Sequence, residues 1–380
     1  MRRHKVKKIL IMPDSFKGSL SAQEFCKVAQ GRLREVFGDR FDIESIPMAD
    51  GGEGTVDCFL SLPGFESVTV KAHDAYMEPL DCRYARRGDI AVIELARAAS
   101  LPSVKGREDP GKTTTYGVGE MIAHAVRSGA SRILLGLGGS CTNDAGCGMA
   151  RAVGTVFTDD EGNRFIPVGD TLDRVRGIDS TAAGKLLADV SLTAMCDVTN
   201  PLYGENGAAY VFAPQKGADA RGVRHLDRNL VKFAETVRRL TGSDLSKEEG
   251  AGAAGGSGFG VRALLGGSLK RGTDLILDTI GFDDMLRDTA LIITGEGNFD
   301  AQSLSGKTVM GIARRAAEHK VPVVVIAGGS EGEENAYCRG VSAVYTTSFG
   351  PQSLEKAKDN IHRDLKRAVI NAARLIDIII

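Results

Sequence analysis

The sequence VPVVVIA at residues 321–327 decides the fold class, because an uninterrupted run rich in Val and Ile is typical of a strand buried on both faces. Further apolar strands are expected at 290–294 and 341–346, and helical patterns at 306–319 and 354–376 alternate with them. Apolar strands that alternate with helices predict an α/β fold whose parallel sheet is covered by helices on both faces.

The N-terminal end of the chain shows the same rhythm. An apolar run at 6–12 is expected to form a strand, and a second strand is expected at 41–47. The pattern between them predicts a helix at 22–36, with Ser21 placed to cap its first turn. We therefore expect the two ends of the chain to belong to one domain.

The middle of the chain has a different rhythm, with short strands expected close together at 67–71, 80–86 and 90–95. Such closely spaced strands indicate an antiparallel or mixed element. Later elements are expected to be a helix at 117–128, strands at 132–137 and 192–197, and a charged helix at 220–240. The change of rhythm predicts a mixed α/β domain at 64–286, inserted into a discontinuous first domain of residues 1–63 and 287–380.

Composition and charge argue against several classes of protein. The 380 residues carry a formal net charge of −1, with both signs spread evenly, so nothing favours nucleic acid or an anionic membrane surface as a partner. No apolar stretch reaches the roughly 18 residues of a membrane helix, and the apolar run near the N-terminus is too short for a signal peptide. The seven scattered cysteines form no CxxC pair, which favours reduced thiols and a cytoplasmic protein. The sequence leaves the oligomeric state open, including a homodimer.

Glycine-rich polar loops follow several of the expected strands, where open α/β sheets bind their ligands. Glycines allow backbone N–H groups to approach phosphate oxygens, and nearby carboxylates can hold magnesium or accept a proton from a hydroxyl. The pattern therefore indicates phosphate chemistry, although any one such loop is equally compatible with an ordinary turn. These loops lie at 14–19, 50–55, 138–144, 250–260, 295–300 and 328–330.

The segment GREDPGKT at residues 106–113 satisfies the P-loop pattern, but its context is unsuitable. Glu108 and Asp109 would face the phosphates with like charge, and Pro110 removes one of the N–H donors. The residues before it are not a convincing buried strand. We therefore do not expect this segment to bind nucleotide phosphates.

Seven segments together form a recognisable set: PDSFKGS at 13–19, MADGGEGT at 48–55, TTTYGVGEMI at 113–122, GLGGSCTNDAGCGM at 136–149, DVTNPLYGENGAAYVFAPQKGA at 197–218, GAGAAGG at 250–256 and TGEGNFDAQSLSGK at 294–307. These motifs resemble those of the bacterial glycerate kinase (glycerate 2-kinase) family. The matches run in order from the first strand to about residue 329, so they cover nearly the whole chain.

The resemblance implies a reaction, two cofactors and a domain arrangement. The family transfers the γ-phosphoryl group of ATP to D-glycerate, usually giving 2-phosphoglycerate, and needs Mg²⁺. It also implies a flavodoxin-like domain built from both chain ends, an inserted α/β domain, and an active site in the cleft between them. This sequence departs from the family pattern at Cys141, Ala145 and Asn298, and the last of these puts in doubt a phosphate-holding role for position 298.

Roles for individual residues follow as hypotheses, since phosphoryl transfer needs mainly positioning and charge neutralisation. Asp197 is expected to be the base that accepts the hydroxyl proton, and Asp300 and Asp144 are the alternative candidates for this role. Asp197 could instead serve only a structural role, as an Asx turn that caps its strand. Lys17 and Asp50 are the other expected catalytic residues. The residues expected to bind substrate or phosphate are Asp14, Ser15, Ser19, Gly51, Gly52, Gly54, Gly139, Ser140, Thr142, Asn143, Asp144, Gly295, Gly297 and Lys307, and those expected to bind metal are Glu53, Glu296 and Asp300.

Three alternatives stay open at this point. The product could be 3-phosphoglycerate, or the acceptor could be a related small hydroxy acid such as tartronate or hydroxypyruvate. The chain could also be a non-catalytic protein that binds small anions, although carboxylates in so many of the loops argue against it.

Overall fold

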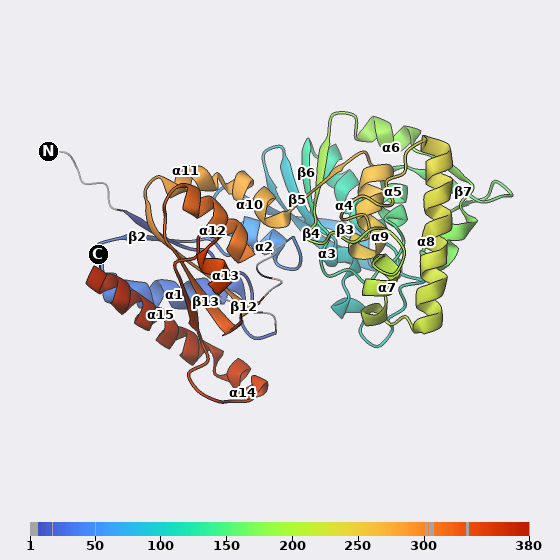
Figure 1. Ribbon diagram of the computed structural model, residues 1–380. Helices are drawn as coiled ribbons and strands as arrows, with labels where there is room; N and C mark the ends of the chain where they lie inside the picture. The colour runs from blue at the N-terminus through green and yellow to red at the C-terminus, as the bar shows by residue number, and fades with distance from the viewer. Residues whose placement is uncertain are drawn as a thin grey trace. The chain divides into compact units, whose positions relative to one another are not determined.

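Five parallel strands from the two ends of the chain form one sheet (Figure 1). The structure is a computed structural model that describes residues 7–16, 18–49, 51–300, 303, 308–331 and 334–379. The chain divides into two units, the first made of Met1–Asp50 with Thr273–Ile380 and the second of Gly51–Gly272. The expected α/β fold class, with a mixed domain inserted in the sequence of a discontinuous parallel-sheet domain, is confirmed.

The sheet of the first unit has the strand order β14-β13-β12-β1-β2, and every neighbouring pair is parallel. When the five strands of the first unit are numbered 1 to 5 along the chain and read from the β2 edge, the order is 2-1-3-4-5, as in flavodoxin-like sheets. The order reverses between the two central strands β1 and β12, because the chain moves to one side after β1 and to the other side after β12. The strands are β1 (Lys8–Ile11), β2 (Asp42–Ser45), β12 (Thr289–Phe299), β13 (Val323–Ser330) and β14 (Ala343–Thr346).

Helices cover this sheet because its central strands are apolar on both faces. Side chains of β1 alternate, so Ile9 and Ile11 pack in the cluster that contains α1 (Ala22–Phe37) and α15 (Ile361–Ile379). Figure 1 shows α1 and α15 together on one side of the sheet and α12 (Thr308–Glu318) on the other. Ser21 caps α1 as expected, because its hydroxyl accepts a hydrogen bond from the Glu24 amide at 3.2 Å.

Two expectations about the C-terminal elements were wrong in detail. The segments expected to be loops after 294 and after 327 continue as strand, since β12 extends to Phe299 and β13 to Ser330. Glycine permits this close pairing, because a Cβ on Gly295 would lie 2.1 Å from the Ile326 carbonyl oxygen. The single helix expected at 354–376 is two helices, α14 (Leu354–Asp359) and α15, which are separated at Asn360.

The second unit contains a mixed sheet with the order β11-β10-β6-β5-β4-β3. The expected antiparallel or mixed element is confirmed, since β4 pairs antiparallel with β3 and β5, and the remaining pairs are parallel. A separate small antiparallel sheet has the order β8-β7-β9. The strands are β3 (Glu66–His73), β4 (Pro79–Arg87), β5 (Ile90–Glu94), β6 (Arg132–Gly136), β7 (Val156–Thr158), β8 (Arg164–Phe165), β9 (Gly177–Asp179), β10 (Ser191–Met195) and β11 (Ser268–Lys270).

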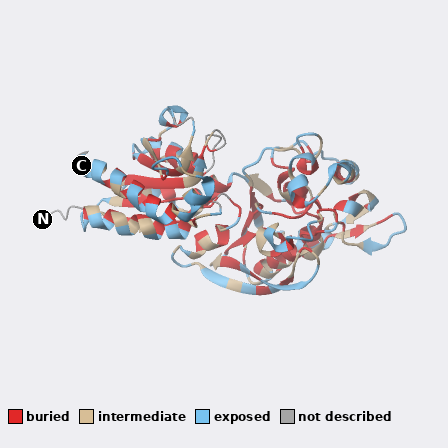
Figure 2. Cartoon of the chain, turned by 90° about the horizontal axis from the view of Figure 1, so that it is seen from below, coloured by how far each residue is buried: buried red, intermediate tan, exposed pale blue. Residues whose placement is uncertain are grey.

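Helices of the second unit pack their apolar sides on these sheets, and Figure 2 shows the buried residues concentrated in the strands and along the inner sides of the helices. Asp219 caps the longest of them, α8, by accepting a hydrogen bond from the Gly222 amide at 2.7 Å. The helices are α2 (Thr55–Leu60), α3 (Ala96–Ala99), α4 (Tyr116–Arg127), α5 (Cys147–Val153), α6 (Thr181–Leu186), α7 (Ala208–Phe212), α8 (Ala220–Thr241) and α9 (Ala253–Ala263), with 3-10 turns η1 (Pro102–Val104), η2 (Gly169–Arg174) and η3 (Pro214–Lys216).

The units divide after residues 50 and 272, and both positions precede the boundaries at 63/64 and 286/287 that the change of strand rhythm indicated. Helix α2 packs on β4 and β5, and the Val56 amide donates a hydrogen bond to the buried carboxylate of Glu94. Helices α10 (Gly272–Ile280) and α11 (Phe282–Leu286) belong instead with the first unit, apart from Gly272 itself. Arg315 of α12 holds them there through ion pairs of 2.6 Å to Asp278 and Asp283.

No helix in the described part of the chain is both long enough and apolar enough to cross a membrane.

Candidate functional site

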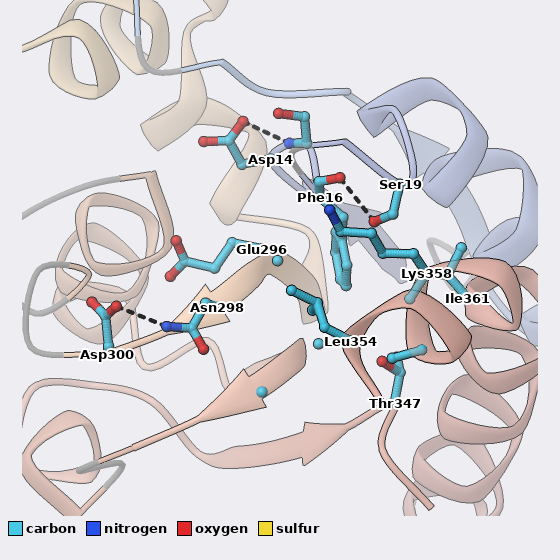
Figure 3. Close-up of a pocket in the computed structure, with 15 residues that line it drawn as sticks. Asp14, Phe16, Ser19, Glu296, Asn298, Asp300, Thr347, Leu354, Lys358 and Ile361 are labelled. Carbon is cyan, nitrogen blue, oxygen red and sulfur yellow. Dashed lines mark hydrogen bonds between the residues drawn. The ribbon is translucent and has the colours of Figure 1, made fainter. Parts of the chain in front are cut away.

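A pocket of about 660 Å³ lies in the first unit, where the chain leaves the carboxyl ends of its parallel strands (Figure 3). Its walls come from the loop after β1, the ends of β12 and β13, and the segment that includes α14. Open α/β sheets bind ligands at this edge, next to the point where the strand order reverses. The lining residues are Asp14, Ser15, Phe16, Ser19, Glu296, Gly297, Asn298, Asp300, Gly328, Gly329, Thr347, Leu354, Ala357, Lys358 and Ile361.

Asp14 holds the loop after β1 in place. One carboxylate oxygen accepts the Ser15 amide at 2.6 Å, and the other accepts the Thr308 hydroxyl at 3.1 Å. The Asp14 amide also donates to the Gly295 carbonyl oxygen at 2.8 Å, which joins this loop to β12. The Ser19 hydroxyl donates to the carbonyl of Phe16 at 3.0 Å. The structure thus brings the predicted residues Asp14, Ser15 and Ser19 to one wall of the pocket.

The end of β12 supplies the second polar wall. Figure 3 shows Glu296, Asn298 and Asp300 along this strand end. The Asn298 side-chain amide donates to the Asp300 carboxylate at 2.8 Å, so position 298 orients a predicted metal ligand. The predicted residues Glu296, Gly297 and Asp300 therefore line the same pocket as Asp14. Gly295 lies one step further inside the strand, where it lets β12 and β13 approach closely.

The third wall was not predicted from the sequence. Leu354, Ala357 and Lys358 of α14 line it together with Ile361 of α15 and Thr347. Their sequence offers no motif, because an exposed helix with alternating charges and apolar residues is typical of any solvated helix. Only the fold places this segment beside the loop after β1.

A second group of predicted residues lies in the second unit, around the loop after β6. Gly51 and Gly52 meet this loop directly: a Cβ on Gly138 would lie 2.4 Å from the Gly52 Cα, and the Gly138 amide donates to the Gly51 carbonyl at 3.2 Å. Gly51 and Gly139 have positive φ values of 85° and 78°, which favours glycine at both positions. The structure therefore brings Gly51 and Gly52 beside the loop of Gly139 and Ser140.

Asp144 is fully buried and holds this loop against the start of α4. Its carboxylate accepts hydrogen bonds from the Thr115 amide and hydroxyl at 2.8 Å, from the amides of Gly146 and Gly148 at 3.1 Å, and from the Thr114 hydroxyl at 3.4 Å. Burial raises the pKa of Asp144, and the hydrogen bonds from Thr115, Gly148 and Gly146 oppose that shift. With both oxygens engaged and no exposed surface, this carboxylate positions the loop in the structure.

Thr142 and Asn143 are buried beside Asp144. The Thr142 hydroxyl and both polar atoms of the Asn143 amide have no hydrogen-bond partner among the described residues. Unused hydrogen-bonding groups inside a protein are uncommon, so these two side chains stand out in the loop. Their predicted contact with phosphate stays a prediction.

Lys216 is a buried cation that sequence reasoning missed, although it lies in the segment 197–218 that carries the family resemblance. Its ammonium donates to the Ser140 hydroxyl and to the Thr142 carbonyl oxygen, both at 2.8 Å. Burial lowers the pKa of Lys216 to about 8, while Cys141 and Asp144 nearby oppose the shift. A buried lysine that contacts a predicted phosphate loop is a candidate functional group.

We expect Lys216 to make stability depend on pH in the alkaline range. Unfolded lysine keeps its proton up to about pH 10.5, whereas folded Lys216 loses it near pH 8. The unfolded state therefore binds more protons between these values, so the free energy of unfolding should rise with pH, by about 3 kcal/mol from this residue. Urea unfolding of the wild type and of Lys216→Met across this pH range measures the effect. The quantity to compare is the difference in the free energy of unfolding between the two proteins at each pH. A difference that does not change with pH would contradict the lowered pKa.

Asp197 and Glu53 are both exposed in the second unit. One Asp197 carboxylate oxygen accepts the Gly272 amide at 3.0 Å, at the first residue of α10. Gly54 precedes α2 with a φ of 93°, which again favours glycine. The predicted residues Lys17, Asp50 and Lys307 lie outside the described residues.

Magnesium requires oxygen ligands, and the first-unit pocket offers carboxylates from Asp14, Glu296 and Asp300. No cluster of three or more His, Cys, Asp or Glu side chains in the described part of the chain is arranged to hold a metal by itself. Mg²⁺ commonly binds through one or two carboxylates, with water and substrate phosphates completing its shell. The available donors fit that kind of shared site.

The segment Gly106–Thr113 uses its own carboxylates to satisfy its backbone. Glu108 accepts the Gly106 amide at 2.9 Å, and Asp109 accepts the Gly111 amide at 3.0 Å. Lys112 forms an ion pair with Asp109 at 2.9 Å. The Thr113 hydroxyl donates outside the segment, to the Cys141 carbonyl oxygen at 2.9 Å. That this segment does not bind nucleotide phosphates stays a prediction.

The chain is similar to known proteins along almost its whole length. The profile of the glycerate kinase family matches residues 9–377. The glycerate kinase of Bacillus subtilis (strain 168) is 39% identical over 373 residues, which cover 97% of each chain. The glycerate 2-kinase of Escherichia coli (strain K12) is 37% identical over 375 residues, which cover 98% of each chain. A crystal structure from Salmonella typhimurium LT2, of a candidate glycerate kinase 2, has a TM-score of 0.86 at 36% identity and covers 98% of each chain.

Proposed function

The chain belongs to the glycerate kinase family, and from that premise we propose that it transfers the γ-phosphoryl group of ATP to D-glycerate and forms 2-phosphoglycerate. Membership makes it an enzyme, a kinase of the glycerate kinase type. The product rests on the relative named glycerate 2-kinase, which matches 98% of this chain. We further propose that the protein acts in the cytoplasm, as its scattered cysteines without a CxxC pair indicate.

The observation that carries the proposal is the pocket at the reversal of strand order in the first unit. Carboxylates and hydroxyls line one side of it, which suits a metal-bound phosphate group and a hydroxyl acceptor. A protein that only binds small anions has no use for three carboxylates in its pocket, because they repel the ligand. The kinase function accounts for them.

We propose that Glu296 and Asp300 hold Mg²⁺ together with the phosphates of ATP. Glu53, in the second unit, stays a predicted metal ligand. The ion would neutralise charge that develops on the transferred group. Lys17 and Lys307 are the proposed cations for phosphate or for the substrate carboxylate, and Asp50 is proposed to bind the hydroxyls of glycerate. Asp197 is the proposed base, because it is an exposed carboxylate that follows a parallel strand.

The proposal is tested by ADP release from purified protein with ATP, Mg²⁺ and a panel of acids. We expect D-glycerate to be the fastest acceptor, ahead of tartronate and hydroxypyruvate. Phosphorus NMR of the product should show 2-phosphoglycerate, and a 3-phosphoglycerate signal would overturn that part. Absence of ADP release with every acid would favour the non-catalytic anion-binding protein.

We expect removal of divalent metal with EDTA to abolish ADP release, because the phosphates and the carboxylates of the pocket would then repel one another. Added Mg²⁺ should restore the rate. The matched control is Ca²⁺ at the same concentration, which binds carboxylates but accepts a looser geometry. Full activity in EDTA would contradict the metal requirement.

A further inference from the structure

We propose that α14 and the start of α15 form the nucleotide wall of the first-unit pocket, where Leu354, Ala357 and Ile361 contact the base and ribose of ATP and Lys358 contacts its phosphates. This inference rests on the proposed kinase function and deepens it, because it assigns the α14 side of the pocket to the nucleotide and not to the acid. We call these four residues the nucleotide wall.

The size of the pocket favours the nucleotide. A volume of about 660 Å³ lies within the range that drug-sized ligands and cofactors occupy. A three-carbon acid would fill a small part of it and leave apolar side chains in contact with water. A nucleoside triphosphate extends across such a space.

The spacing of the nucleotide wall gives it one apolar face. Leu354 and Ala357 lie three residues apart on α14, so they point to the same side of that helix. Ile361 begins α15 and lines the same pocket. Leu354 is 74% exposed, whereas Ile361 is buried. An exposed large apolar side chain at the mouth of a pocket can be covered by the flat face of a base, which removes that surface from water.

The charges of the pocket separate into two sides. The carboxylates of Asp14, Glu296 and Asp300 lie on the side of the strand ends, while Lys358 is the cationic side chain among the described lining residues. Its ammonium lies at the loop after β1, since a Cβ on Gly18 would be 3.5 Å from Nζ. Figure 3 shows Lys358 beside Phe16 and Ser19. A triphosphate that extends from the apolar face toward the carboxylates would pass this ammonium.

The test compares Lys358→Met with Lys356→Met, a matched control because Lys356 is exposed on the same helix and does not line the pocket. We expect Lys358→Met to raise KM for ATP, and Kd for a fluorescent ATP analogue without glycerate, by about tenfold, the loss of one charge-assisted contact. Lys358→Arg should recover most of the binding. KM for glycerate should change less than about twofold, and Lys356→Met should resemble the wild type.

Leu354→Ala tests the apolar part separately, and its exposure makes the substitution harmless to the fold. We expect it to weaken ATP binding by about fivefold and to leave binding of inorganic tripolyphosphate unchanged, since that ligand has no base.

Two outcomes would overturn the inference while the kinase function stands. One is a Lys358→Met protein whose KM rises for glycerate and not for ATP, which would assign the wall to the acid. The other is unchanged ATP binding in both variants. Failure of the wild type to release ADP with any acceptor would instead overturn the proposed function itself.

Discussion

Replacing Asp197 with asparagine is expected to lower kcat by about 10²- to 10⁴-fold with little change in either KM, because the acceptor hydroxyl would lose the general base that we propose. Asparagine keeps an oxygen in the same place, so it can still accept the Gly272 amide that Asp197 now accepts at 3.0 Å. The substitution therefore removes the negative charge and not the contact at the start of α10. Steady-state ADP release at saturating ATP and glycerate measures the effect.

The control for Asp197→Asn is its thermal unfolding, which should match the wild type within a few degrees if the Gly272 contact survives. Asp197→Ala removes that contact as well and should lower the unfolding temperature further. A variant Asp197→Asn that keeps most of its kcat would show that Asp197 only caps α10. The base would then be sought at Asp300, by the same substitution.

Replacing Asp144 with alanine is expected to destabilise the protein by about 3 kcal/mol or more. The change leaves the buried amides of Thr115, Gly146 and Gly148 without an acceptor, and each unpaired buried donor costs about 1–3 kcal/mol. It also opens space under a tightly packed loop. Urea unfolding followed by circular dichroism measures the loss in the free energy of unfolding.

Asp144→Asn is the matched control. Its single side-chain oxygen can still accept the hydrogen bonds that the Thr115 hydroxyl and the Gly148 amide donate to one Asp144 oxygen. We expect it to lose less stability than Asp144→Ala. If the asparagine variant is stable but has lost catalysis as completely as Asp197→Asn, Asp144 acts in the chemistry and does not only position the loop. Equal stability of the alanine variant and the wild type would contradict the buried hydrogen-bond network.

The fold could be predicted largely because buried parallel strands are apolar along their whole length. The runs at 290–294 and 321–327 identified β12 and β13, but their ends could not be predicted. Residues such as Gly295 and Gly328 favour turns in isolation, and only the pairing of two strands shows that their missing side chains allow close contact. The break at Asn360 is similar, since no glycine or proline marks it.

The candidate site could be predicted where its residues lie at or just after the end of a strand, as for Asp14, Glu296 and Asp300. Lys358 and Lys216 could not be found in this way. Each lies in a helical turn remote in sequence from the loop that it contacts, so its role depends on packing between distant segments. Sequence patterns describe neighbours along the chain, whereas these contacts are set by the topology of each unit.

The central position of β1 has a consequence during synthesis on the ribosome. Its two partners are β2, which follows after α1, and β12, which is translated only after the whole of the second unit. The second unit can complete its six-stranded sheet from one continuous segment of the chain. Until β12 is synthesised, the edge of β1 that pairs with β12 stays unpaired. Such an edge is a template for pairing with other chains. The nascent protein is therefore most exposed to aggregation in the interval between the emergence of β1 and that of β12, a period set by the length of the insertion.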